Sequence, residues 1–317
     1  MAYELEEAKK LVVAAGKKLV ESGLIARTWG NVSARISDTQ FVITPSGRAY
    51  ETLTPEEVVV VNIEDCSYEG DIKPSSEKGV HAAAYRHHPT VDFVIHTHQK
   101  AATIVSITGM EIRNVYKEFQ PVLGNKVPCA DYAMSTTNSL RKKVEMCIMM
   151  NPGCRAIMLM HHGTLCMGDT YEQAFEIADA LEKCCQRVIK DNYLRHSWAE
   201  TYSDEGKRNF YLKKNGAVAM PESICDLGSS VRNGKTFSLT VGGETVDVDL
   251  ETGLGITGIA PKCAKIHKAI YDSQDCSIIK HVTDPDVIAV SCTGEDMIPM
   301  IDDFAQIAGV EVKKRPW

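Results

Sequence analysis

The sequence lacks any apolar run long enough to cross a membrane, since no such run reaches the ~18 residues that a helical span needs. It also lacks a strong charge imbalance, with 35 basic residues, 42 acidic residues and a formal net charge of -7. Neither a membrane nor a nucleic acid is therefore expected as a partner. The opening stretch MAYELEEAKKLVVAAGKKLVESG mixes acids and lysines with its apolar residues, so no signal peptide is expected.

Paired cysteine motifs are missing as well. The eleven cysteines are an odd number, none of them belongs to a Cys-x-x-Cys pair, and they are scattered among apolar neighbours. Because unpaired thiols would be a hazard in a secreted protein, we expect a cytoplasmic location in which thiols stay reduced. Each cysteine is then expected to be a small, buried hydrophobic residue.

The pattern of segments predicts an α/β fold. Apolar residues recur at helical spacing over residues 5–19, and Thr170 with Gln173 forms a capping box that opens a long helix. Residues 93–98 and the two segments on either side of Gly163 have the composition of strands, and so does DVIAVSCTG at residues 286–294. A chain of 317 residues is expected to form two units rather than one.

The pattern of residues changes near residue 220, and the sequence that follows resembles part of the first half. Phe41, Thr44 and Gly47 match Phe237, Thr240 and Gly243, and His81, Ala83 and Tyr85 match His267, Ala269 and Tyr271. Residues 92–127 align without gaps on residues 277–312, with His96 opposite His281, Phe119 opposite Phe304 and Gly124 opposite Gly309. Chance similarity is the alternative, but ordered matches in three blocks favour a domain over residues 1–220 and a degenerate partial repeat over residues 221–317.

Two histidines one residue apart stand in the apolar stretch VDFVIHTH. Residues i and i+2 of a strand face the same way, so His96 and His98 can direct two imidazoles at one metal ion. His162, at a strand end before Gly163, offers a third nitrogen, whereas His161 beside it must face the other way. By spacing alone, a solvated or hydrogen-bonded pair remains the alternative. The other histidines of this half, His81 among them, have no partner in sequence and are interpreted as surface or core groups.

Two short stretches have the chemistry of a phosphate site. TPSG, residues 44–47, is a turn whose backbone N–H groups and Ser46 hydroxyl can donate hydrogen bonds. KPSSE, residues 73–77, puts Ser75 and Ser76 at a helix start, where unpaired N–H groups and the helix dipole favour an anion. Ser75 could equally be a simple N-cap. Glu77 could be an ordinary first-turn carboxylate or a general base.

Six segments, in this order, resemble the zinc-dependent class II aldolase and adducin family, which includes L-fuculose-1-phosphate aldolase and L-ribulose-5-phosphate 4-epimerase. They are TWGNVSAR, ITPSGRAYETL, KPSSEKGVHAAAY, VIHTHQKAATIVSITG, VPCADYA and HHGTLCMGDTYEQAFEIADALE. The resemblance covers about residues 1–217. It implies a three-layer α/β/α domain with a central, mostly antiparallel sheet, and usually a homotetramer with active sites between neighbouring subunits.

The resemblance also implies roles for single residues. His96, His98 and His162 correspond to the ligands of one Zn²⁺ per chain, although another divalent metal could take its place, and Glu77 corresponds to the catalytic carboxylate. Tyr116 lies one residue out of register with a tyrosine that acts from the neighbouring subunit. The residues that correspond to a phosphate cradle are Asn31, Ser46, Gly47, Ser75 and Ser76.

The implied function is that of a lyase in carbohydrate metabolism, which reversibly cleaves a phosphorylated sugar of the fuculose-1-phosphate type into dihydroxyacetone phosphate and an aldehyde. The epimerase branch carries Asp where this chain has Glu77. It also has a catalytic tyrosine after a segment that FYLKKNGAVA resembles, and this chain has no tyrosine there, so cleavage is favoured. A sugar-phosphate epimerase, a dehydratase, a decarboxylase and a non-catalytic adducin-like binding protein remain alternatives.

The repeat is expected to hold no metal. Thr283 stands where the second histidine should be, and no carboxylate matches Glu77. One imidazole cannot make a zinc site. Residues 221–317 would therefore serve packing, oligomer contacts or a cover over the first domain, or form a plain stabilising appendage.

Overall fold

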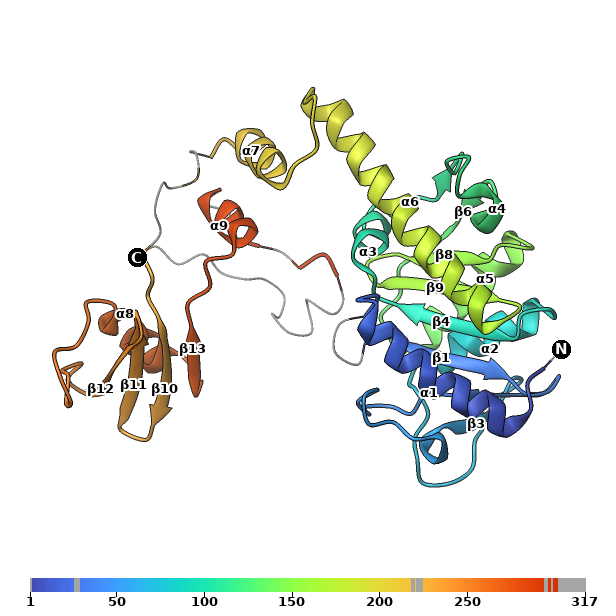
Figure 1. The fold of residues 1–317 in the computed structure, drawn as a ribbon, viewed down its shortest axis with the longest axis horizontal. Helices are drawn as coiled ribbons and strands as arrows, with labels where there is room; N and C mark the ends of the chain where they lie inside the picture. Colours follow the sequence, from blue (N-terminus) through green and yellow to red (C-terminus); the bar gives the residue numbers. More distant parts are fainter. Residues whose placement is uncertain are drawn as a thin grey trace. The chain divides into compact units, whose positions relative to one another are not determined.

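The computed structural model describes residues 2–25, 29–217, 220, 225–293, 296–297 and 299–301. The chain forms two compact units, of which the first contains the residues up to Tyr202 and the second those from Ser203 to Met297 (Figure 1). No helix in the described ranges is both long and apolar enough to span a membrane. All eleven cysteines are free thiols.

A seven-stranded sheet in the order β3-β2-β1-β4-β9-β8-β7 forms the centre of the first unit. Every neighbouring pair is antiparallel except β7 and β8, which confirms the predicted, mostly antiparallel sheet. The strands are β1 (Asn31–Arg35), β2 (Gln40–Ile43), β3 (Val59–Asn62), β4 (Phe93–Thr97), β7 (Cys129–Ala130), β8 (Ala156–Leu159) and β9 (Gly163–Gly168).

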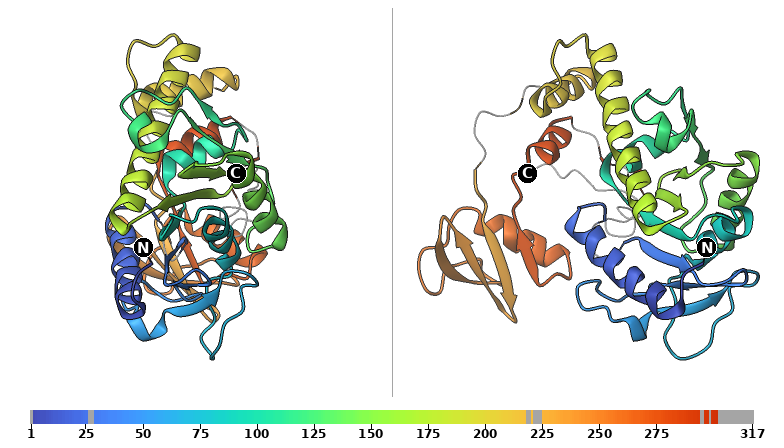
Figure 2. Two further views of the ribbon diagram at one scale, coloured as in Figure 1. Left: turned by 90° about the vertical axis from the view of Figure 1, so that its right-hand side faces the viewer. Right: turned by 45° about the vertical axis from the view of Figure 1, so that its right-hand side comes forward.

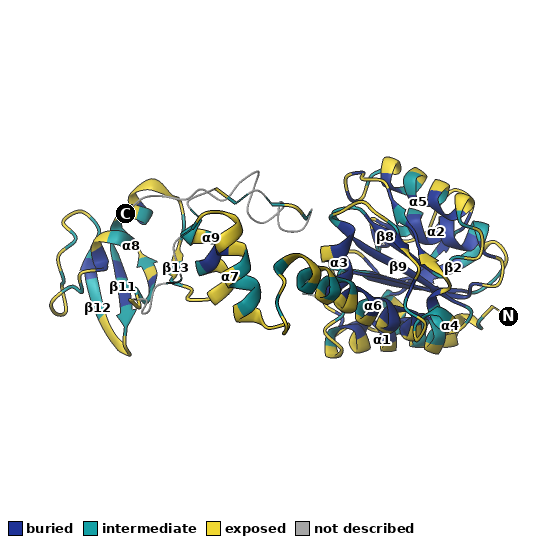
Figure 3. Cartoon of the chain, turned by 90° about the horizontal axis from the view of Figure 1, so that it is seen from above, coloured by how far each residue is buried: buried dark blue, intermediate teal, exposed yellow. Residues whose placement is uncertain are grey.

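Helices cover both faces of this sheet and make three layers, as predicted (Figure 3). Strand side chains alternate between the two faces, so Phe41 and Ile43 pack under one helical layer and Val42 under the other. One layer is α2 (Lys78–His87) with α5 (Asn138–Met150). The other is α1 (Leu5–Glu21), α3 (Lys100–Ser106) and α6 (Tyr171–Ser197), and Figure 2 shows α1 in blue along this face.

Short elements complete the first unit. A side-chain cap marks the start of helix α6. The Thr170 side chain accepts a hydrogen bond from the Gln173 N–H, which confirms the predicted start of α6. Ser75 Oγ accepts from the Glu77 N–H just before α2. The short elements are η1 (Pro55–Glu57), β5 (Ile112–Arg113), α4 (Gln120–Leu123) and β6 (Lys126–Val127).

The second unit has a four-stranded antiparallel sheet in the order β12-β11-β10-β13, with a small core under helix α8. Strands β11 and β12 form an antiparallel hairpin. The elements are α7 (Asp204–Lys214), β10 (Ser229–Asn233), β11 (Thr236–Val241), β12 (Glu244–Asp249), α8 (Ala264–Ser273), β13 (Ile278–Lys280) and α9 (Pro285–Cys292). The predicted matches at Phe304 and Gly309 lie outside the described residues.

The prediction of a strand over residues 286–294 is wrong, because residues 285–292 form helix α9. A short apolar run is compatible with either element. The deciding signals precede it: Pro285 occupies the first turn, and the Asp284 carboxylate accepts hydrogen bonds from the N–H groups of Asp286 and Val287.

Candidate metal centre and active site

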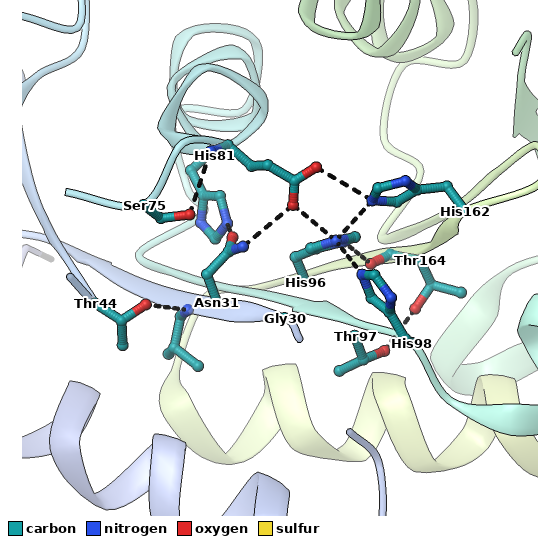
Figure 4. A network of polar contacts seen from close by, with 12 residues as sticks. Gly30, Asn31, Thr44, Ser75, His81, His96, Thr97, His98, His162 and Thr164 are labelled. Atoms are coloured by element: carbon teal, nitrogen blue, oxygen red, sulfur yellow. Dashed lines mark hydrogen bonds and ion pairs between the residues drawn. The ribbon is translucent and has the colours of Figure 1, made fainter. Parts of the chain in front are cut away.

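Four side chains meet at one end of the first sheet. Glu77, His96, His98 and His162 each direct one ligand atom to a common point, and these atoms lie within 4.8 Å of one another. They come from the start of α2, the end of β4 and the turn before β9. Figure 4 shows the three imidazoles pointing toward one another. The structure therefore brings together the three predicted metal ligands and the predicted catalytic carboxylate.

Strand pairing places two of the histidines. His96 lies opposite Leu165 of β9, and His98 follows two residues later, so its imidazole lies on the same side of the strand. The turn that carries His162 is held close to β4. A Cβ at Gly163 would stand 2.4 Å from the Thr97 carbonyl oxygen and 3.1 Å from His98 Cδ2. Only glycine permits this approach.

The Nε2 atoms of the three rings face one another, and the tautomer of His96 is fixed by its backbone contact. His96 Nδ1 lies 2.8 Å from the Thr164 carbonyl oxygen, and since a carbonyl only accepts, Nδ1 carries the proton and Nε2 keeps its lone pair. That Nε2 lies 2.9 Å from His98 Nε2 and 3.2 Å from His162 Nε2. The backbone contact is the kind of outer contact that orients a metal-binding imidazole.

The Glu77 carboxylate is the fourth member of the cluster and faces the imidazoles of His96 and His162. Its carboxylate is buried, with Oε2 3.0 Å from His96 Nε2 and Oε1 3.2 Å from His162 Nε2. Burial by itself would raise the pKa of Glu77, but the neighbouring imidazoles of His96 and His162 outweigh it and hold the pKa well below its usual range. The carboxylate is therefore ionised at neutral pH.

These four groups fit a divalent cation. In a tetrahedral zinc site with bonds of about 2.1 Å, neighbouring ligand atoms are roughly 3.4 Å apart, close to the separations seen between these nitrogens and oxygens. Glu77 Oε1 is buried without a hydrogen bond of acceptable geometry in the described part of the chain. A cation at the common point would satisfy this oxygen together with the converging ring nitrogens. The cluster is thus a possible metal site.

A buried polar network that sequence reasoning missed lies behind Glu77. Asn31 Nδ2 donates to Glu77 Oε2 over 3.2 Å, and Asn31 Oδ1 lies 2.5 Å from His81 Nε2. His81 is fully buried, which confirms its interpretation as a core group, but its contact with Asn31 was not predicted. The pairing of Asn31 with His96 across β1 and β4 brings Asn31 to the metal cluster, and sequence spacing carries no signal for that contact.

A pocket of about 190 Å³ opens beside the cluster and contains the predicted phosphate cradle. Asn31, Ser46, Gly47, Ser75 and Ser76 all line it, together with Glu77, His98 and His162. Larger hollows of about 430 and 860 Å³ lie elsewhere in this unit, and no histidine lines them. The lining residues that sequence reasoning did not single out include Trp29, Arg48, Ser135 and Thr136.

Two of the backbone N–H groups that were expected to bind a phosphate already donate hydrogen bonds within the chain. The Ser46 N–H donates to the Lys73 carbonyl, and the Ser75 N–H donates to the Thr44 carbonyl, because the two segments bridge each other like neighbouring strands. The expectation that these N–H groups are free is therefore wrong. Gly47, whose φ of +71° suits glycine, and the exposed Ser46 and Ser76 remain at the mouth of the pocket.

Tyr116 does not join the cluster within its own chain. Its hydroxyl donates to Asp191 of α6 over 2.8 Å, and its ring lies under the Arg187 guanidinium. Partial burial and the neighbouring Asp191 raise the pKa of Tyr116 to about 12. Its predicted role in a neighbouring subunit stays a prediction.

Comparison with known proteins places this arrangement in a family. The model of the class II aldolase and adducin N-terminal domain matches residues 10–189. The chain is 32% identical over 183 residues to 5-deoxy-D-ribulose 1-phosphate aldolase of Bacillus thuringiensis serovar kurstaki, covering 57% of this chain and 84% of that protein. It is 30% identical over 191 residues to an L-ribulose-5-phosphate 4-epimerase of Salmonella paratyphi C, covering 56% and 82%.

A solved structure supports the same placement. The structure of an L-fuculose 1-phosphate aldolase superposes with a TM-score of 0.55 at 28% identity, covering 66% of this chain and 96% of that one. The chain therefore belongs to the class II aldolase and adducin family. The predictions of that family, of its fold and of an enzyme of the class II aldolase type are confirmed.

Replacing His98 with alanine tests the metal centre. We expect His98→Ala to weaken binding of a divalent metal by more than about 100-fold, because changes to groups that only support a ligand already cost about 10–100-fold. Metal content after dialysis and titration of the metal-free protein with Co²⁺ measure the effect. His161→Ala is the matched control, since the neighbouring His161 packs against Tyr132 outside the cluster. Equal affinities in the two variants would contradict the assignment.

Proposed function

We propose that the chain is a zinc-dependent aldolase that reversibly cleaves a ketose phosphate into dihydroxyacetone phosphate and an aldehyde. The convergence of three imidazoles and one buried carboxylate beside a hydroxyl-lined pocket carries this proposal. Relatives named as ribulose- and fuculose-phosphate aldolases support the substrate class. A cytoplasmic homotetramer, with Tyr116 reaching the aldehyde oxygen of a neighbouring active site, is part of the same proposal.

His96, His98 and His162 would hold the metal, and Glu77 lies beside them as the proton-transferring carboxylate. A bound divalent cation supplies Lewis acidity toward the sugar's carbonyl and hydroxyl oxygens, where negative charge develops during cleavage. The protein's task is then to present the sugar in one orientation and to exclude alternatives. The pocket does so by placing the serine hydroxyls at its mouth and the Glu77 carboxylate at its floor.

Glu77 moves the proton at C3. In the cleavage direction the C3–C4 bond breaks, its electron pair stays on the three-carbon fragment as an enediolate, and the C4 hydroxyl gives its proton to solvent water as the aldehyde forms. Glu77 takes up one proton from solvent and delivers it to C3, and in the synthetic direction its carboxylate removes that proton and returns it to solvent. The amide of Asn31 donates to Glu77 Oε2, so the carboxylate is oriented rather than free to rotate.

Arg48 supplies positive charge to the phosphate subsite. It is the one Lys or Arg among the described residues that line the pocket, and its Nε lies 3.5 Å from Glu57 Oε1. Its exposed guanidinium stands next to Gly47, where the hydroxyls of Ser46 and Ser76 are also available. A planar guanidinium that can bind two phosphate oxygens at once suits this position.

Glu77→Gln in a substrate screen tests the reaction. Zinc-loaded protein is supplied with ketose 1-phosphates, and release of dihydroxyacetone phosphate is followed. We expect release by the native protein and a loss of about 10²–10⁴-fold in kcat for Glu77→Gln, the usual contribution of a positioned proton-transfer group. Glu176→Gln, which changes an exposed carboxylate of α6, should match the native rate.

The products decide between the candidate reactions. An epimer, loss of water or loss of CO₂ in place of two fragments would replace cleavage with another reaction on the same scaffold. Absence of turnover with every phosphorylated sugar, in protein that loses its fold when stripped of metal, would favour a binding protein with a structural metal.

Arg48→Gln tests the phosphate subsite. We expect KM for the ketose 1-phosphate to rise about tenfold with kcat unchanged, because a charge-assisted hydrogen bond contributes roughly 1.5–3 kcal/mol and this one is made equally before and during reaction. Steady-state kinetics measure both constants, with Arg113→Gln, outside this pocket, as control. A fall in kcat with KM unchanged would remove Arg48 from phosphate binding.

We further propose that residues 221–317 are a degenerate, metal-free partial repeat of the first domain. The strand order β12-β11-β10-β13 parallels β3-β2-β1-β4, with α8 in the place of α2 and α9 in the place of α3. His96 of β4 lies beside the start of β1, and His281, the residue after β13, lies beside the residue before β10. His281 contacts the Leu227 N–H rather than a second imidazole.

Metal stoichiometry tests the repeat. The full chain should bind about one divalent ion, and His281→Ala should leave both stoichiometry and affinity unchanged, since one imidazole cannot make a zinc site. Equilibrium dialysis against Zn²⁺ measures both. A second tight ion that His281→Ala removes would contradict the proposal.

A further inference from the structure

A chain of four buried polar groups leads from the core of the first unit to Glu77. Tyr85 Oη lies 2.7 Å from Ser33 Oγ, and Ser33 Oγ lies 2.6 Å from His81 Nδ1. His81 Nε2 meets Asn31 Oδ1, and Asn31 Nδ2 reaches Glu77 Oε2. His81 is fully buried between β1 and the metal cluster, as Figure 4 shows, yet it is not a metal ligand.

The orientation of the Asn31 amide sets the direction of the other hydrogen bonds in this chain. Asn31 Nδ2 donates to Glu77 Oε2, so the NH₂ group of the amide faces the carboxylate. Asn31 Oδ1 then faces His81, which must carry its proton on Nε2. Burial lowers the pKa of His81 to about 3, so the ring is neutral and Nδ1 accepts from the Ser33 hydroxyl. Ser33 in turn accepts from Tyr85.

The second unit contains the same chain without its last step. Ser230 Oγ lies 2.7 Å from His267 Nδ1 and 2.9 Å from Tyr271 Oη, but His267 Nε2 lies 2.7 Å from the Leu227 carbonyl oxygen. Gly228, which accepts from the His281 N–H, stands at the strand position of Asn31 and has no side chain to receive the imidazole. The serine, histidine and tyrosine thus stabilise a helix against a sheet in both units, and only the first unit connects them to a site.

We propose that His81 is a positioning residue of the metal centre, which holds the Asn31 amide in the orientation that donates to Glu77. It touches neither metal nor substrate. Without an Nε2–H donor at this place, the Asn31 amide loses the partner of its oxygen and can rotate away, and Glu77 then loses its orienting hydrogen bond. This inference rests on the proposed metal centre.

His81→Ala and His267→Ala form a matched pair, because they remove the same imidazole from the same Ser–Tyr setting in the two units. We expect His81→Ala to weaken binding of Co²⁺ to the metal-free protein by about tenfold, as supporting groups of metal ligands usually do, and His267→Ala to leave it unchanged. His81→Gln keeps an amide donor for Asn31 and should recover most of the affinity. Equal affinities in native protein and His81→Ala, or equal losses in both alanine variants, would overturn the proposal.

A double-mutant cycle separates positioning from general loosening of the fold. In an Asn31→Ala background, His81→Ala should cause no further loss of Co²⁺ affinity, because the residue through which it acts is already gone. The same additional loss in both backgrounds would show that His81 acts by another route and would overturn the proposal.

Crystal structures of the metal-free variants give a test that needs neither metal nor turnover. The Asn31 amide should leave Glu77 in His81→Ala and keep its contact in His81→Gln. An unmoved amide in His81→Ala would overturn the positioning role even if the metal binds. Native protein that binds no Co²⁺ would instead end the metal proposal, and the position of Asn31 would still decide the role of His81.

Discussion

The convergence of three imidazole nitrogens and one carboxylate on a single point is the constraint around which the first unit is organised. Like acceptors held near 3 Å apart in a buried place repel one another, so the arrangement is costly unless a cation occupies its centre. Several features serve to hold it. The Thr164 carbonyl sets the His96 tautomer, Gly163 lets the turn approach β4, and Asn31 steadies Glu77.

The three-layer architecture explains why this point lies where it does. Because β1, β4 and β9 are antiparallel neighbours, the start of β1, the end of β4 and the start of β9 lie at the same end of the sheet. Helix α2 begins close to that end. Ligands separated by 85 residues, from Glu77 to His162, are thereby brought within hydrogen-bonding distance. The covering helices bury the strands from both sides, which keeps the short turns at the edge fixed.

The two units share one buried arrangement of polar side chains. Both keep a buried serine, histidine and tyrosine between the first strand and the helix that packs on it. In the first unit the asparagine, the carboxylate and two further imidazoles extend this network to a pocket. In the second, the histidine donates to a backbone carbonyl, and the network ends there. The same contacts end at the backbone in one unit and continue to the Glu77 carboxylate in the other.

Much of the site was predictable from local sequence. The period of two along a strand put His96 and His98 on one face, the motif before Gly163 supplied His162, and composition identified most strands and helices. The run at residues 286–294 belongs largely to a helix rather than to the predicted strand, because a short apolar run fits either element and only its cap decides. The N–H groups of Ser46 and Ser75 donate to backbone carbonyls because two loops bridge each other, and no local pattern in the sequence encodes that bridge.

What the sequence determined by itself is therefore the set of residues with the right chemistry and the faces on which they lie. What only the tertiary structure decided is which of them meet. His81, Asn31 and Glu77 are joined through the pairing of β1 with β4 and the packing of α2, and Arg48 reaches the pocket through a turn. Such contacts between distant residues arise from strand register and helix packing, and the chain carries no periodic signal for them.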